Sequence, residues 1–521
     1  MKLIPPACVI GALFLYASAY LNRDLWFDEA LTFLNFAQMD SPLEIYRNYV
    51  IPNNQILYTV VLHYWSMLLP EGIDPVVWFR LLSFLFGGAT LLLLYRLFRV
   101  RMGGGAILLP VLVALAVSVP FLIYATALRG YMLSALFVTL TLDAALNFAG
   151  RPGVKRGILY GVCSLATVAV IPSNLAVLAG VVLYALPVFG CRFYARRAFW
   201  LLALIPPAAF LLFYLPILRQ FLGCLRLGEG WNDGSRALLA VLAAFVYSFA
   251  MLLLPGTGSL LAFDRVRYRW VRSVRALIWL LPVPMALLLP VAPFPRVFFP
   301  FWPLWVLLLA AGVRDLTALN CRWRRRWNFG VWIGGLTAVV LGWSFIAQQP
   351  MFRLVFSRRF GGAGADDYFY GYYLRAEHTP RATAAELAER FGGRPLSFYA
   401  SFQADPWPLL FYLNAAGVEF RDFRFDGPRG PVEALAPGMF VILRSDESAA
   451  EIEKRFGRRG DAVFPPVRIE LKEGRSIYIE GMIDRVDILR GERVKIIDYK
   501  TGNENFSKSE AEAGYRLQLM L

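Results

Sequence analysis

Residues 199–217 read FWLLALIPPAAFLLFYLPI, with no charged side chain between Arg197 and Arg219. A helix of about 20 such residues crosses the ~30 Å hydrocarbon layer of a membrane. Comparable apolar runs recur along the first 350 residues, and we interpret eleven of them as membrane-spanning helices. They lie near 4–21, 76–95, 105–121, 131–149, 158–171, 174–190, 199–217, 236–255, 274–291, 297–313 and 328–347.

The composition of the whole chain also indicates a membrane protein. Of its 521 residues, 58% are hydrophobic and 17% are charged, whereas soluble domains have roughly 45–50% and about 25%. The formal net charge of +16 would suit nucleic acid, but basic residues of membrane proteins gather in cytoplasmic loops. The five cysteines and two histidines show no paired spacing, so the sequence predicts neither a disulfide framework nor a zinc site.

The loops between the spans predict the orientation. Basic residues cluster in alternate loops, and the opposite loops hold isolated arginines. By the positive-inside rule, the clustered loops and the amino terminus are cytoplasmic. The clusters lie at 96–101, 151–156, 192–197, 265–275 and 314–326. We therefore expect a multi-pass protein of the inner (plasma) membrane, with loop 22–75 and everything after the last span outside the cytoplasm.

The composition changes after the last apolar run. Residues 349–462 alternate short strand-like runs with amphipathic stretches, a pattern that predicts a small extracytoplasmic α/β domain. The expected fold class is thus mainly α and polytopic, with about 11 transmembrane helices over residues 1–348. This α/β domain and a β-rich α/β fragment over 463–521 follow it.

The first external loop is rich in polar groups. It opens with DLWFDEA at 24–30, which contains Asp28 and Glu29, and continues with PNNQILY at 52–58. Acids near the start of a helix also suit the helix dipole, so a purely structural role is the alternative. Two arginines, Arg129 and Arg296, lie at the external ends of later spans. Arginines at the membrane edge either snorkel or bind an anionic head group.

In chain order these motifs resemble the GT-C superfamily of membrane glycosyltransferases. They are WFDEA at 26–30, PNN-x-x-LY at 52–58, Tyr-x4-Arg-Gly-Tyr at 124–131 and Pro-Arg-x3-Pro at 295–300. The resemblance is to the bacterial branch, of the family 39 type, related to protein O-mannosyltransferases and aminoarabinose transferases. It covers about residues 1–350, and a soluble domain like the one that follows is common in that family. Gln55 stands where many members carry a histidine.

The resemblance implies an inverting sugar transfer from a polyprenyl-phosphate donor to an acceptor on the outer face of the membrane. Asp28 is the expected base for the acceptor hydroxyl, with Glu29 second, because neighbours on a helix cannot both point at one substrate. Arg129 and Arg296 are expected to hold the donor phosphate, whose charge grows as it leaves. The expected substrate-binding residues are Asn53, Asn54, Tyr58 and Tyr131.

The sugar, the acceptor and the need for a metal stay open. The acceptor is a lipid, a polysaccharide or a protein of the cell envelope. A divalent cation between Asp28 and Glu29 is an alternative, although no further ligand cluster stands in the sequence. A membrane transporter or lipid flippase is the alternative function, but transport sites place charged groups near the bilayer midplane, and these spans have few.

The C-terminal stretch carries a second, unrelated signature. IYIEGMIDRVD at 477–487 is followed by VKIIDYKTG at 494–502 and YRLQL at 515–519. This resembles the RecB-like PD-(D/E)xK nuclease module of bacterial ATP-dependent helicase–nucleases; a charged β-hairpin is the alternative. The resemblance implies that Asp484 and Asp498 would hold Mg²⁺, that Lys500 would steady the attacking water, and that Gln518 matches a position on the helix that follows.

We expect this module to be incomplete and inactive. It has no upstream ligand-bearing helix, and the predicted topology places it outside the cytoplasm, so a nucleic-acid partner is not expected. Lysine usage also changes here. The lysines before Pro465 are Lys2, Lys155 and Lys454, and those after it are Lys472, Lys495, Lys500 and Lys508. We interpret 463–521 as a fused gene fragment or an assembly artefact, joined around 457–468.

Overall fold

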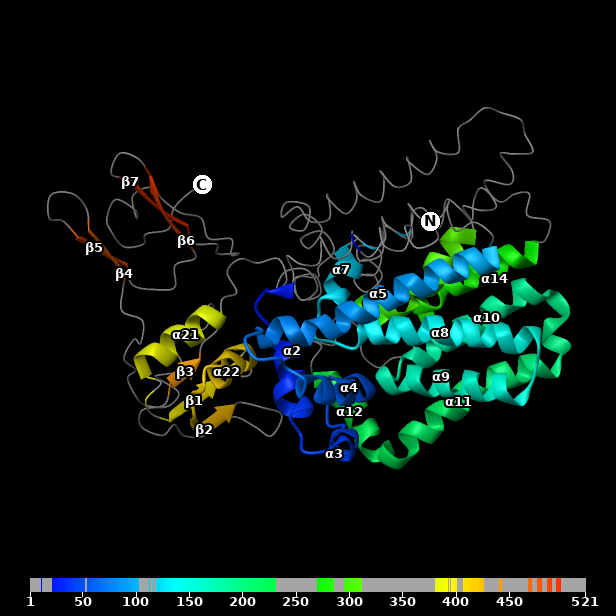
Figure 1. Cartoon of the computed structure of the whole chain (residues 1–521), viewed down its shortest axis with the longest axis horizontal. Helices are drawn as coiled ribbons and strands as arrows, with labels where there is room; N and C mark the ends of the chain where they lie inside the picture. The colour runs from blue at the N-terminus through cyan, green and yellow to red at the C-terminus, as the bar shows by residue number, and fades with distance from the viewer. Residues whose placement is uncertain are drawn as a thin grey trace. The chain divides into compact units, whose positions relative to one another are not determined.

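A computed structural model of the chain divides into two compact units, residues 1–375 and 376–521 (Figure 1). It describes residues 11, 21–51, 54–102, 112, 116, 119–230, 269–284, 295–311, 380–391, 393, 395–400, 406–425, 440–442, 467–470, 476–479, 485–489 and 493–497. The spans expected near 4–21, 105–121, 236–255 and 328–347 lie wholly or largely outside these residues.

The described part of the first unit is a bundle of helices. Helix α8 packs on α5, α9 and α10, and α11 packs on α9 and α10, so that α8 to α11 lie side by side (Figure 1). The long helices are α5 (Pro75–Met102), α8 (Tyr131–Gly150), α9 (Val154–Val170), α10 (Asn174–Phe189) and α11 (Arg197–Tyr214). The expected mainly helical fold is therefore found.

Three described stretches are long and apolar enough to cross a membrane. They are Pro75–Arg101, Tyr131–Gly150 and Arg197–Leu225. Shorter apolar helices cover Asn174–Phe189, Ser273–Pro284 and Arg296–Ala311. These helices coincide with predicted spans, while the count of eleven stays a prediction.

Local chemistry sets where these helices end. Helix α9 stops at Val170 because Ile171 precedes Pro172 and takes an extended conformation, with φ −142° and ψ 124°. Helix α10 ends before Gly190, whose φ of 94° suits a residue without a Cβ.

Buried hydroxyl and amide groups tie the bundle together. The hydroxyls of Thr141 in α8 and Thr167 in α9 lie 2.9 Å apart. Asn174 Nδ2, at the start of α10, donates to Ser134 Oγ of α8 at 2.6 Å and to the Thr167 carbonyl at 2.8 Å. Such hydrogen bonds help to hold helices together in a membrane, where the hydrophobic effect does not drive one helix against another.

The segment before α5 folds into short helices beside this bundle. They are α2 (Phe27–Thr32), the π-helix η1 (Phe33–Ala37), α3 (Pro42–Arg47) and α4 (Ile56–Ser66). Trp65 of α4 and Trp78 of α5 stack with ring centroids 4.4 Å apart. Each indole N–H also donates to the other residue's carbonyl, at 2.9 and 3.1 Å, so α4 is fixed to the start of α5.

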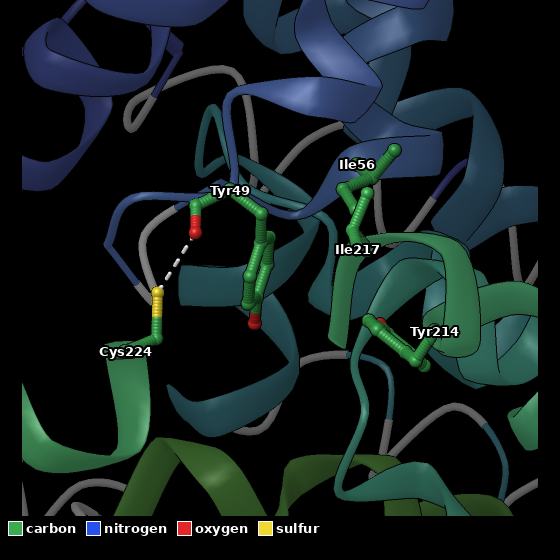
Figure 2. Close-up of a cluster of buried hydrophobic side chains, with 5 residues drawn as sticks. All are labelled: Tyr49, Ile56, Tyr214, Ile217 and Cys224. Atoms are coloured by element: carbon green, nitrogen blue, oxygen red, sulfur yellow. Dashed lines mark hydrogen bonds between the residues drawn. The ribbon is translucent and has the colours of Figure 1, made fainter. Parts of the chain in front are cut away.

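A second anchor holds the chain just before α4. Figure 2 shows Tyr49 and Ile56 packed with Tyr214, Ile217 and Cys224. These three come from the end of α11, from the 3-10 helix η3 (Leu215–Ile217) and from α12 (Leu218–Gly230). Cys224 Sγ donates to the Tyr49 carbonyl at 3.1 Å. The segment that carries Asn54 and Gln55 is therefore held by buried apolar contacts on one side and by the tryptophan pair beyond it.

The second unit contains a small parallel sheet. Strand β1 lies between β2 and β3, pairs with both in parallel, and is joined to β2 through helix α22. Its elements are α21 (Pro380–Phe391), β1 (Leu396–Ala400), α22 (Pro406–Ala415), β2 (Phe420–Phe425) and β3 (Phe440–Ile442). Helix and strand alternate here as an α/β domain requires. Its boundaries at 349 and 462 and its position outside the cytoplasm stay predictions.

The C-terminal stretch contributes two antiparallel strand pairs. One joins β4 (Val467–Glu470) to β5 (Ser476–Ile479), and the other joins β6 (Arg485–Leu489) to β7 (Arg493–Ile497). Among the described residues these pairs form separate two-stranded sheets.

Candidate functional site

Asp28 lies in the first turn of α2 and is paired with an arginine from far along the chain. Its Oδ2 is 3.1 Å from Arg296 Nη2, and the two side chains are 2% and 10% exposed. Arg296 belongs to the short 3-10 helix η4 (Pro295–Phe301), and its guanidinium lies 5.2 Å from the ring centroid of Trp26. The predicted base and one predicted phosphate-binding arginine are thus in direct contact.

Glu29 faces a different set of donors. Its Oε1 accepts from Arg80 Nε at 3.1 Å and from the Leu128 amide at 2.6 Å. Its Oε2 accepts from Arg80 Nη2 at 2.6 Å and from the Trp26 amide at 3.1 Å. A carboxylate has about four lone-pair sites, so these bonds fill its accepting capacity. The Arg80 and Glu29 side chains have no exposed surface.

Arg80 also holds the chain that enters α2. It donates to the carbonyls of Leu21, Arg23 and Asp24, just before the helix begins. Arg80 is the only charged residue in the predicted span 76–95 and was not singled out from the sequence. A lone charge in an apolar span is rare and is expected to have a partner, so this signal could have found it.

Arg129, the other predicted phosphate-binding arginine, reaches the same helix. Its Nη1 donates to Thr32 Oγ1 at 2.7 Å and lies 3.5 Å from the Asp28 carbonyl. The guanidinium is 5.8 Å from the ring centroid of Tyr131. The structure therefore brings together Asp28, Arg129 and Arg296 around one short helix.

The turn that carries Arg129 is held by its backbone. The amides of Leu128, Arg129 and Gly130 donate to Glu29 Oε1, to the Ala127 carbonyl and to Gln55 Oε1, at 2.6, 2.8 and 2.5 Å. Ser83 Oγ donates to the Arg129 carbonyl at 3.3 Å. Three consecutive amides and one carbonyl are thus satisfied, which fixes the backbone at Arg129.

The predicted substrate-binding residues have differing surroundings. Asn54 Nδ2 donates to the carbonyls of Ile45 and Asn48 at 2.9 and 3.2 Å, so this amide group holds the loop. The Tyr58 hydroxyl lies 3.1 Å from Ser83 Oγ. Burial raises the pKa of Tyr58, so the phenol stays protonated. Asn53 lies outside the described residues.

Tyr131 forms part of an aromatic wall beside Arg129. Its ring lies 4.9 Å from that of Tyr124, which in turn lies 4.2 Å from Phe299 of η4. The turn that carries Arg129 and the helix η4 that carries Arg296 are thereby in contact through these aromatic rings. A substrate contact for Tyr131 stays a prediction.

Two further expectations concern metal and the C-terminal stretch. Across the described residues, no three His, Cys, Asp or Glu side chains gather so as to hold a metal ion. The residues that the nuclease resemblance singles out all lie outside the described residues; they are Asp484, Asp498, Lys500 and Gln518. In the sequence, Asp484 directly precedes β6 and Asp498 directly follows β7.

The C-terminal stretch is similar to nucleases. A family model described as the PD-(D/E)XK nuclease superfamily matches residues 439–521. An ATP-dependent helicase/deoxyribonuclease subunit of Alkaliphilus oremlandii is 52% identical over 69 residues, which are 13% of this chain. This chain spans only 6% of that relative's length. The resemblance inferred from the motifs at 477–519 is therefore confirmed, and the match begins before the predicted boundary at 463.

Among solved structures, the chain is similar to ArnT from Cupriavidus metallidurans. The apo crystal structure matches with a TM-score of 0.46 and 15% identity, covering 80% of this chain and 85% of that one. The structure described as bound to undecaprenyl phosphate matches with a TM-score of 0.47 and 15% identity, covering 81% and 85%.

Proposed function

We propose that this protein is a membrane glycosyltransferase that moves a sugar from a polyprenyl-phosphate-linked donor to an acceptor on the outer face of the membrane. One observation carries the proposal. The buried carboxylate of Asp28 and the guanidinium groups of Arg129 and Arg296 converge on α2. A base in contact with one arginine, on a short helix that a second arginine also contacts, suits a reaction in which a hydroxyl attacks and a phosphate leaves.

In the proposed reaction, Asp28 takes the proton of the acceptor hydroxyl as its oxygen attacks the anomeric carbon. The bond between that carbon and the phosphate oxygen breaks, and its electron pair stays on the phosphate, which gains one unit of negative charge. The configuration at carbon inverts because attack and departure occur on opposite faces. Arg129 and Arg296 stabilise the growing charge.

Arg296 has two anionic partners in this scheme. Its guanidinium contacts Asp28 at 3.1 Å, and a donor phosphate at the same group competes with that carboxylate. An arginine presents five N–H donors in a fork, so it can hold both anions while its bond to Asp28 weakens. The weakened contact leaves an Asp28 carboxylate oxygen available to accept the proton of the acceptor hydroxyl when the donor is in place.

Glu29 has a supporting role in this scheme. Its oxygens already accept hydrogen bonds from Arg80, Leu128 and Trp26. An incoming hydroxyl would have to displace one of these donors from a side chain with no exposed surface. We therefore assign the base to Asp28 and the alignment of the surrounding chain to Glu29.

The test is transfer by purified protein in detergent, with labelled polyprenyl-phosphate sugars and a membrane extract as acceptor. Wild type is compared with Asp28→Asn and with Asp40→Asn, a control at an exposed acid of the same segment. Transfer by wild type and the control, but not by Asp28→Asn, supports the proposal. Equal transfer by Asp28→Asn moves the base elsewhere, and no transfer by wild type with any donor favours a transporter or flippase.

We propose that residues 463–521 are a fused fragment or an assembly artefact without nuclease activity. The shift in lysine usage near Pro465 and the similarity of 439–521 to a different class of protein support a join in this region. Long-read sequencing across codons 439–468 tests it. The same uninterrupted reading frame in independent isolates would rule out the artefact and leave a genuine fusion.

A further inference from the structure

We propose that Gln55 is a positioning residue that fixes Arg129 for the donor phosphate. This inference rests on the proposed function and deepens it. Gln55 directly precedes α4, and its side chain is buried, with 4% of the residue exposed. Its Oε1 accepts the amide N–H of Gly130 at 2.5 Å. Gln55 thus holds the backbone of Gly130, which directly follows Arg129.

A similar hydrogen bond holds the residue that precedes Arg129. Glu29 Oε1 accepts the amide of Leu128 at 2.6 Å, so the two amides that flank Arg129 are held by side chains of the segment before α5. These two hydrogen bonds restrict the backbone of Arg129. Its guanidinium is thereby directed at Thr32 Oγ1, 2.7 Å away, and at α2.

Close packing makes Gln55 sensitive to small shifts. A Cβ on Gly130 would lie 2.7 Å from Tyr58 Cβ, 3.0 Å from Gln55 Oε1 and 3.0 Å from Val170 Cγ1. The φ of Gly130 is −75°, so an L-residue fits the backbone and only the lack of space excludes a side chain. Helix α4 therefore approaches the turn closely enough that the Gln55 contact depends on glycine at 130.

Gln55 itself is placed by apolar packing. The next residue, Ile56, belongs to the buried cluster with Tyr49, Tyr214 and Ile217 (Figure 2). The preceding residue, Asn54, is tied to the Ile45 carbonyl at 2.9 Å. The packing of this cluster therefore fixes the position of Gln55. Gln55 in turn fixes the turn at 128–130, which carries Arg129.

This arrangement matters because a phosphate-binding group needs precise placement. Binding groups must be held to within about 0.5 Å by packed neighbours, and a misplacement of about 1 Å can cost a large factor in rate. Gln55→Leu keeps a similar volume but removes the acceptor, which leaves the Gly130 amide unsatisfied. We expect the turn to shift and the affinity for a polyprenyl phosphate to fall about tenfold.

The experiment measures the dissociation constant of undecaprenyl phosphate, without a sugar, for the full-length protein in detergent. Gln55→Leu is compared with Thr59→Val, a control on the adjoining helix whose buried hydroxyl bonds to the Gln55 carbonyl. Gln55→His is the conservative variant, because a neutral imidazole nitrogen can accept the Gly130 amide. We expect weak binding for Gln55→Leu, wild-type binding for the control, and recovery for Gln55→His.

A double-mutant cycle separates positioning from general structural support. In an Arg129→Gln background, Gln55→Leu should cause no further loss of affinity, because the group through which it acts is gone. Additive losses overturn the proposal, as does wild-type affinity for Gln55→Leu. If Gln55→Leu fails to fold, Gln55→Met, which also lacks a strong hydrogen-bond acceptor, takes its place in the same cycle. If wild type binds no polyprenyl phosphate at all, the proposed function fails and this inference fails with it.

Discussion

Arg80 Nη2 lies 2.6 Å from Glu29 Oε2, and neither side chain has any exposed surface. The two neighbouring acids, Asp28 and Glu29, therefore have different partners. Glu29 is committed to Arg80 and to the Leu128 amide, whereas Asp28 meets Arg296 in the space beside α2. This division bears on stability, on metal binding and on phosphate binding.

The first prediction concerns stability. We expect Glu29→Gln or Arg80→Met to lower the free energy of unfolding by about 3 kcal/mol, because each leaves a buried charge without its partner. Thermal or denaturant unfolding in detergent measures it. The double variant should lose less than the sum of the two single variants. Asp143→Asn is the control, since its pair with Arg101 is 19% and 34% exposed and should contribute about 0.5 kcal/mol or less. Equal losses at both pairs would contradict the prediction.

The second prediction concerns metal ions. Since Glu29 has its accepting capacity filled by Arg80, Leu128 and Trp26, Asp28 and Glu29 cannot both coordinate one cation without breaking those bonds. We expect EDTA, followed by dialysis, to leave sugar transfer unchanged. A loss of transfer that Mg²⁺ or Mn²⁺ restores would show that the carboxylates rearrange to bind metal.

Apolar patterning predicts most of the described bundle. Runs such as 131–149 and 199–217 leave the chain one way to bury its backbone polar groups in hydrocarbon, which is an α-helix. Helices α8 and α11 accordingly cover these runs. The convergence of Asp28 and Arg296 on one site was expected from the family resemblance, because spacing within a single segment says nothing about residues so far apart.

The contacts that hold the site could not be inferred in the same way. Glu29 pairs with Arg80, and Gln55 pairs with the amide of Gly130, across different helices and loops. These contacts depend on how closely the elements pack, which no local pattern encodes. Arg80 carried a signal of its contact with an acid, because it is the only charged residue in its predicted span.

The third prediction concerns the C-terminal stretch. We expect the purified protein not to cut duplex DNA in the presence of Mg²⁺, because the sequence shows no ligand-bearing helix upstream of the nuclease-like motifs at 477–519. A plasmid-nicking assay measures it. Cleavage that disappears in Asp498→Asn and Lys500→Ala but persists in Lys508→Ala would establish an active nuclease and overturn this expectation.

The last prediction tests the competition at Arg296. Asp28→Asn removes the carboxylate 3.1 Å from its guanidinium and leaves a buried cation that favours another anion. We expect this variant to bind undecaprenyl phosphate roughly three- to tenfold more tightly than wild type while losing sugar transfer. Arg296→Gln should bind it more weakly and also lose transfer. Dissociation constants measured in detergent at fixed ionic strength decide the matter. Weaker binding by Asp28→Asn would mean that Asp28 orients Arg296 for the phosphate and does not compete with it.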